Sequence, residues 1–101
     1  MLYYTQLIFV KAGCEQVFHS FEEKVLPLLA AHNGELIYRV RPDRNNFVTA
    51  VGDLPYEIHL VTFKSKADFE SYGRDPARLA FMDLKNNSVE RILLIEGTAI
   101  G

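Results

Sequence analysis

Cysteine is almost absent from this chain, since Cys14 is the only one among 101 residues. One cysteine excludes an internal disulfide and a cysteine-rich zinc site, and it favours a reducing cytoplasm as the location. Long apolar runs are missing too: the longest, such as Val25–Ala31, fall far short of the about 20 residues that a bilayer requires. The sequence therefore predicts no membrane span, and it lacks the basic start of a signal peptide.

A large charge of either sign is also missing. Eleven Lys and Arg against 13 Asp and Glu give a net charge of −2, which provides no electrostatic basis for binding nucleic acid or an anionic membrane. With only four prolines and six glycines, and with 49% hydrophobic residues, the composition excludes disorder and collagen-like order. We expect one globular domain over residues 1–101 with a single two-layer core.

Hydrophobic periodicity divides the chain into six elements. They are strands over Tyr3–Val10, Glu35–Arg41, Tyr56–Lys64 and Val89–Glu96, a helix over Gly13–His32, and a helical region from Ser65 to about Asn86. Phe47–Val51 is expected to continue the second strand briefly. A kink or restart is predicted near Leu26, because Pro27 removes one backbone hydrogen bond. Likewise Gly73 ends the first part of the second helical region, and Asp75-Pro76 restarts it.

The first helix carries an apolar stripe about 120° wide, which is typical of a helix that faces a core. Cys14 falls at the centre of this stripe. Glu15, His19 and Glu22 lie on the opposite side with i, i+4, i+7 spacing. This spacing would allow a metal ion, but a position opposite the stripe predicts a solvated face, and we expect no metal site.

The order β-α-β-β-α-β predicts a ferredoxin-like α+β sandwich with an antiparallel sheet in the order 4-1-3-2 and both helices on one face. Both faces of the strands are apolar. Strand one, for example, offers Tyr4 and Ile8 on one side and Leu7 and Phe9 on the other. An uncovered apolar sheet usually marks a partner surface, so we expect a homodimer through the free sheet face.

Three stretches resemble the small proteins of domain-of-unknown-function family 1330. They are Leu29–Glu35, Phe63–Ser65 before an aromatic-bearing helix, and Arg91–Gly97. The resemblance implies the dimeric α+β barrel superfamily, in which two ferredoxin-like sheets pack face to face. Its relatives include cofactor-independent monooxygenases, muconolactone isomerases, haem-using enzymes and stress-responsive proteins.

No standard catalytic spacing is present, so the candidate residues come from their expected places in the fold. Gln6, Arg39 and His59 should converge in the middle of the free face. A histidine beside a fixed cation suits a proton shuttle or an anion site. Alternatively, His59 and Arg39 bridge the dimer interface with Glu57 or Glu90.

A second group is expected between the sheet and the helices, where superfamily relatives hold their substrates. It consists of Tyr38 and Tyr56 on the helix-facing side, Asp83 on the inner arc of its helix, and Tyr72 near the helix break. The alternative is that the tyrosines belong to the core with their hydroxyls at its rim. His32 is either a helix cap or a wall of the same pocket.

These observations predict a homodimer that binds a small, largely apolar or aromatic molecule without a cofactor. Its chemistry would be cofactor-independent oxidation or isomerisation, with His59, Arg39 and Tyr38 as catalytic residues. The alternative is a binding or structural dimer without turnover. A cavity of roughly 300 Å³ or more with convergent polar groups favours a ligand site over a purely structural interior.

Overall fold

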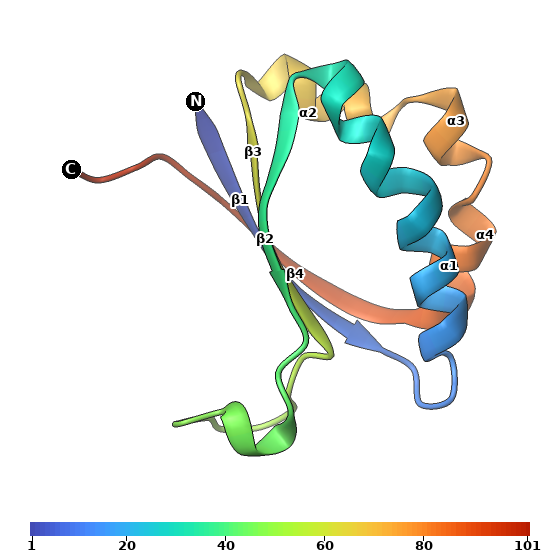
Figure 1. The fold of residues 1–101 in the computed structure, drawn as a ribbon, viewed down its shortest axis with the longest axis vertical. Helices are drawn as coiled ribbons and strands as arrows, with labels where there is room; N and C mark the ends of the chain where they lie inside the picture. The colour runs from blue at the N-terminus through green and yellow to red at the C-terminus, as the bar shows by residue number, and fades with distance from the viewer.

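The computed structural model describes residues 1–101 and contains a four-stranded antiparallel sheet, with the α-helices together on one of its faces (Figure 1). The strands are β1 (Leu2–Val10), β2 (Gly34–Val40), β3 (Glu57–Phe63) and β4 (Val89–Gly97), and the sheet order is β2-β3-β1-β4. The helices are α1 (Glu15–Val25), η1 (Leu26–His32), η2 (Arg44–Asn46), α2 (Lys66–Gly73), α3 (Pro76–Leu79) and α4 (Met82–Ser88). This is the predicted ferredoxin-like α+β fold with the predicted strand order.

The break predicted in the first helical region is confirmed. The α-helix α1 ends at Val25, and the 3-10 helix η1 begins at Leu26 with Pro27 in its first turn. Asn33 ends η1 in the left-handed conformation, with φ of 56°. Cys14, expected at the centre of the buried stripe, instead precedes α1 and is only half-buried, because the helix begins at Glu15.

The caps of the second helical region form as expected, but its last part was predicted wrongly as one helix to about Asn86. The Ser65 side chain accepts a hydrogen bond from Asp68 N, and Asp75 caps the restart by accepting one from Ala77 N. The backbone then leaves the helical conformation at Phe81, and α4 begins at Met82. This second break resets the helical phase, so Asp83 is exposed rather than on an inner arc.

The segment between β2 and β3 forms no strand, which corrects the expectation for Phe47–Val51. Asp43 caps the short helix η2, and this turn directs the chain away from the sheet (Figure 1). Val48 and Val51 are almost fully exposed, since no neighbouring strand pairs with them.

The strand register creates rows of side chains that cross the whole sheet. The inner row, which faces the helices, runs Arg39–His59–Gln6–Leu94 from β2 to β4. On the other face, two apolar rows follow the same path, and we call them the outer rows. They are Tyr38–Leu60–Thr5–Ile95 and Val40–Ile58–Leu7–Leu93.

The predicted assignment of the two sheet faces is wrong. Gln6, Arg39 and His59 were expected on the free face, but they point towards the helices. Tyr38 was expected on the helix-facing side, but it lies in an outer row and is 45% exposed. Strand alternation separates two faces without showing which one the helices cover. A register shift between Leu36 and Tyr38 also breaks the alternation within β2.

The tightest part of the core lies where α2 and η1 meet the sheet. Tyr4, Leu29, Val61 and Phe63 are buried together there, and the ring of Tyr4 stacks on Phe69 with centroids 4.2 Å apart. These residues also form one wall of an internal space between the helices and the sheet, which holds the candidate site. None of the helices is long and apolar enough to cross a membrane.

Candidate functional site

A cavity of about 370 Å³ lies between the inner face of the sheet and the helices. Fourteen of its 21 lining residues are hydrophobic, which suits a ligand that is mostly apolar. Charged or polar side chains reach it from several elements, and they are Gln6, Glu22, His59, Glu70, Tyr72, Arg78 and Lys85. The volume exceeds the roughly 300 Å³ expected for small-molecule sites, and polar groups converge on it.

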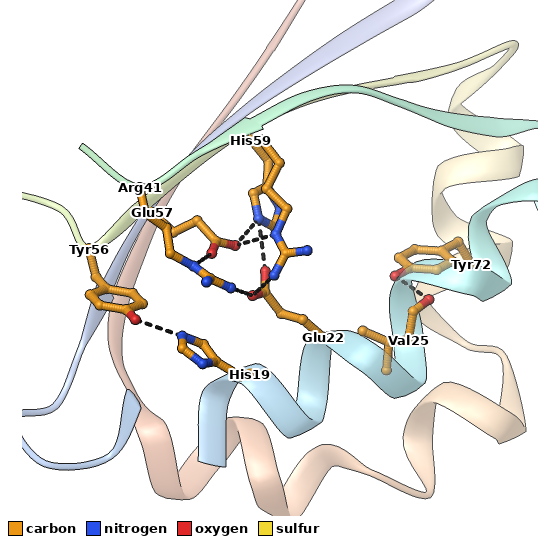
Figure 2. Close-up of polar contacts among 9 residues, drawn as sticks. His19, Glu22, Val25, Arg41, Tyr56, Glu57, His59 and Tyr72 are labelled. Atoms are coloured by element: carbon orange, nitrogen blue, oxygen red, sulfur yellow. Dashed lines mark hydrogen bonds and ion pairs between the residues drawn. The ribbon is translucent and has the colours of Figure 1, made fainter. Parts of the chain in front are cut away.

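Two carboxylates and one imidazole are fully buried beside this cavity. Glu22 projects from α1, while Glu57 and His59 project from β3, and Figure 2 shows them pointing towards one another. Their exposed fractions are 1%, 0% and 4% respectively. His59 Nε2 forms a short hydrogen bond with Glu57 Oε2 and lies 2.8 Å from Glu22 Oε2. Only Glu22 and His59 of these three residues line the cavity.

Two arginines on and beside β2 neutralise the carboxylates. Arg39 Nη2 donates to Glu22 Oε1 at 2.8 Å, and its Nε donates to Glu57 Oε2 at 3.2 Å. Arg41 Nε donates to Glu57 Oε1 at 2.5 Å. The arginine side chains are 33% and 40% exposed, so the ion-pair network reaches solvent on the β2 side.

The environment moves the two carboxyl pKa values in opposite directions. Burial raises the pKa of Glu22, and the neighbouring Glu57 raises it further. Burial alone would also raise the pKa of Glu57, but its hydrogen bonds with His59, Glu22 and Arg41 prevail and lower it. Burial would lower the pKa of His59, yet the close contacts of its ring with both carboxylates outweigh that effect and raise the pKa. Carboxyls whose pKa values diverge in this way are typical of acid–base sites.

One oxygen of Glu22 makes no well-formed hydrogen bond. Glu22 Oε2 is buried and lies 2.8 Å from His59 Nε2, but no hydrogen bond of good geometry reaches it. A buried unpartnered carboxyl oxygen is costly in a purely structural core. Here it lies at the cavity wall, where it is available to accept a proton or a hydrogen bond from a bound molecule.

Glu22, Glu57 and His59 also offer three ligand atoms within 4.8 Å of one another, as a metal site would. Both carboxylates are already paired with arginines. A divalent cation would have to displace these pairs or share the carboxylates with positive charges. The arrangement therefore favours acid–base chemistry over metal binding.

The structure brings together only some of the predicted site residues. Gln6, His59 and Tyr72 line the cavity. Arg39 does not line it, but it forms an ion pair with Glu22, which does. Tyr72 also donates a hydrogen bond to Val25 O at 3.1 Å (Figure 2). Tyr38 is separated from the cavity by the sheet itself.

Three other predicted residues lie outside the cavity. The Tyr56 hydroxyl hydrogen-bonds to His19 Nε2 at 2.6 Å, between the start of β3 and α1 (Figure 2). His32 links the end of η1 to the second helical region through Ser71 at 2.9 Å and Asp75 at 2.7 Å. Asp83 is exposed on α4.

Sequence reasoning missed Glu22 and Arg41 as site residues. Glu22 was predicted on the solvated side of its helix together with Glu15 and His19, and this prediction is wrong because Glu22 is buried. The buried surface of α1 extends beyond its apolar stripe, because Arg39 and His59 of the sheet pair with Glu22 at the edge of that stripe. Glu57 was named only as a possible partner across a dimer, but it pairs with His59 within one chain.

No protein-family model matches the chain, and no curated protein matches it either. Solved structures do resemble it. A protein of unknown function from Rhodopseudomonas palustris is 13% identical with a TM-score of 0.83, over 99% of this chain and 82% of that one. A DABB family protein with a ferredoxin-like fold from Mesorhizobium loti is 19% identical with a TM-score of 0.68, over 99% and 97%.

A third structure, from Bacteroides fragilis, is described as a dimeric protein of unknown function and ferredoxin-like fold. It is 15% identical to this chain with a TM-score of 0.69, over 95% of this chain and 93% of that one. Identities this low concern the fold alone. The chain is an α+β protein of ferredoxin-like fold.

Proposed function

We propose that the cavity binds a small, largely apolar or aromatic molecule and that Glu22 and His59 move a proton on it. The observation that carries this proposal is the unpartnered Oε2 of Glu22, which is buried at the cavity wall beside His59. A carboxyl with a raised pKa in an apolar site is a suitable general base near neutral pH. We therefore favour an isomerase that needs no cofactor.

The simplest reaction for this geometry is proton transfer next to a carbonyl group. Glu22 takes a proton from the carbon, the C–H electron pair forms a carbon–carbon double bond, and the carbonyl π electrons move to oxygen. Where the ligand has a carbon–carbon double bond between its β and γ carbons, return of the proton to the γ carbon shifts that bond into conjugation and completes an isomerisation. His59 keeps Glu22 in place and supplies positive charge while the negative charge develops on the ligand. An oxidation by dioxygen without a cofactor would begin with the same proton abstraction.

The first test is deuterium exchange into 2-tetralone, a neutral bicyclic ketone whose C1 protons are acidic. In D2O, proton NMR should show that the protein accelerates loss of the C1 signal. His59→Gln should lower this acceleration at least ~100-fold, the low end of the loss when one group that stabilises developing negative charge is removed. The substitution retains a hydrogen-bonding side chain but removes the positive charge that His59 can carry beside Glu22.

His19→Gln is the matched control, because it makes the same exchange at a histidine on α1 that bonds to Tyr56 outside the cavity. It should leave the exchange rate within about twofold of the wild-type rate. Binding of 2-tetralone without any acceleration would contradict catalysis and favour the alternative, a binding protein without turnover. Absence of binding would contradict the ligand site altogether.

We also propose that two copies of the chain pair through the outer rows. These rows carry several large apolar side chains that are 42–48% exposed, among them Val40, Leu93 and Ile95. The solved structure from Bacteroides fragilis is described as dimeric, and a sheet-to-sheet assembly would cover this apolar face. Membership in domain-of-unknown-function family 1330 and a cytoplasmic location are part of the same proposal, and both rest on the sequence.

Sedimentation at micromolar concentration tests the dimer. The wild-type protein should sediment at twice the chain mass of 11.5 kDa. The double substitution Leu93→Lys and Ile95→Lys should give the chain mass, since it places charges in both outer rows. Val48→Lys with Val51→Lys, on the exposed loop, is the control and should remain dimeric. A wild-type protein that sediments as a monomer would rule out this assembly.

A further inference from the structure

Two cations line the cavity without any acidic partner. They are Arg78 on α3 and Lys85 on α4, and neither takes part in an ion pair. The acidic residues that line the same cavity are already engaged, because Glu22 pairs with Arg39 and Glu70 pairs with Arg74. The positive charge on the helix side of the cavity is therefore uncompensated.

Arg78 is held in place while its hydrogen-bonding edge stays free. Its guanidinium lies over the rings of Tyr72 and Phe21, at 5.1 and 5.9 Å from their centroids. Of its nitrogen atoms only Nη1 is engaged, with Met82 Sδ at 3.7 Å. The Nε atom is buried and has no hydrogen-bond partner. The two rings hold the guanidinium in a fixed plane, and its free Nε can donate one of the two hydrogen bonds of a bidentate arginine–carboxylate contact.

The positive charge of Lys85 also lacks a nearby negative partner. Its pKa is lowered by burial and, in addition, by the nearby charge of Arg78. A negative charge bound between the two side chains would offset both effects. Because their elements, α3 and α4, differ from those of Glu22 and His59, an anion there leaves the rest of a ligand free to reach the acid–base pair.

We propose that the natural ligand is an apolar carboxylic acid whose carboxylate binds Arg78 and Lys85. This inference rests on the proposed function and narrows it to a substrate class. The apolar walls take an aromatic or unsaturated body, and the cation pair fixes the orientation of that body relative to Glu22. We expect the site to prefer a planar carboxylate to a phosphate, because one free side of the guanidinium can donate two parallel hydrogen bonds to two coplanar oxygens.

The test compares 2-naphthoate with 2-naphthamide, which have nearly the same shape but differ in charge. Titration monitored by naphthyl fluorescence should show that the wild-type protein binds the acid at least ~10-fold more tightly than the amide, or about 1.4 kcal/mol. Arg78→Gln should remove this preference and leave binding of the amide unchanged. Arg74→Gln, at a position whose side chain is 74% exposed, is the matched control and should retain the preference.

A second variant, Lys85→Met, gives the same readout should Arg78→Gln fail to fold, with the exposed Lys66→Met as its control. Equal affinity for acid and amide would overturn the carboxylate site and leave the proposed function standing. So would a preference for the acid that survives both Arg78→Gln and Lys85→Met. If neither naphthyl compound binds, the carboxylate site is overturned, and the 2-tetralone measurement decides the proposed function separately.

Discussion

Replacing Phe21 with alanine should destabilise the protein by about 3–5 kcal/mol, the usual cost of removing a buried phenylalanine ring. Phe21 is 6% exposed on α1, and it borders the cavity. Its removal loses the burial energy of the ring and enlarges a space that already exists, so the surroundings cannot easily close around it. Arg78 would also lose one of its two aromatic contacts.

Urea unfolding measures this change in the free energy of unfolding. All variants are compared at one protein concentration, because the stability of a dimer depends on concentration. Val48→Ala is the control, since Val48 is 96% exposed, and it should change stability by no more than about 0.5 kcal/mol. A loss below about 1 kcal/mol for Phe21→Ala would show that the ring does not pack in solution as it does here.

Replacing Glu57 with glutamine should cost about 3 kcal/mol at pH 5.5, the lower end for breaking a buried ion pair. The substitution removes the negative charge that serves His59, Arg41 and Arg39 together. The lower end applies because both arginines are about one-third exposed or more and can turn towards water. Glu35→Gln, on the exposed side of β2 and without an ion pair, is the control and should be nearly neutral.

The effect of Glu57→Gln should be greatest in a window of pH. The pKa of Glu57 is lowered, so its contribution is present above the unfolded value of about 4.3 and is lost as pH falls through the folded value. The pKa of His59 is raised, so its contribution is present below about 6.5 and is lost as pH rises through the folded value. Unfolding at pH 4, 5.5 and 8.5 should give the largest difference from wild type at pH 5.5. A stability loss for Glu57→Gln that grows steadily from pH 5.5 to 8.5 would contradict the pairing of Glu57 with a charged His59.

The fold could be predicted because its determinants are local. Pro27 breaks a helix wherever it stands, and Ser65 and Asp75 cap the residues that follow them directly. The order of strands follows from connection rules that do not depend on individual contacts. The break at Phe81 has no such local signal, which explains why the exposure of Asp83 was predicted wrongly.

The site could be predicted only in part, because it depends on contacts between distant elements. The polar strand residues Gln6, Arg39 and His59 could be placed in neighbouring positions, but the covered face of the sheet could not be identified from alternation. Glu22 looks solvated on a helical wheel, and its burial depends on contacts with the sheet residues Arg39 and His59, 17 and 37 positions later in the chain. The spacing of Glu57 and His59, two residues apart on one largely apolar strand, was the one available sign that a charged partner was needed nearby.

The inner row has a gradient of polarity along its length. It begins with a guanidinium at Arg39, passes through an imidazole at His59 and an amide at Gln6, and ends with an aliphatic side chain at Leu94. A molecule lying across this row meets a different chemical environment at each strand, so the row distinguishes one orientation of the molecule from the reverse. Swapping Gln6 and Leu94 would move the amide to β4 and the aliphatic side chain to β1, next to His59, and would alter the order of polarity with little change in the size of the space.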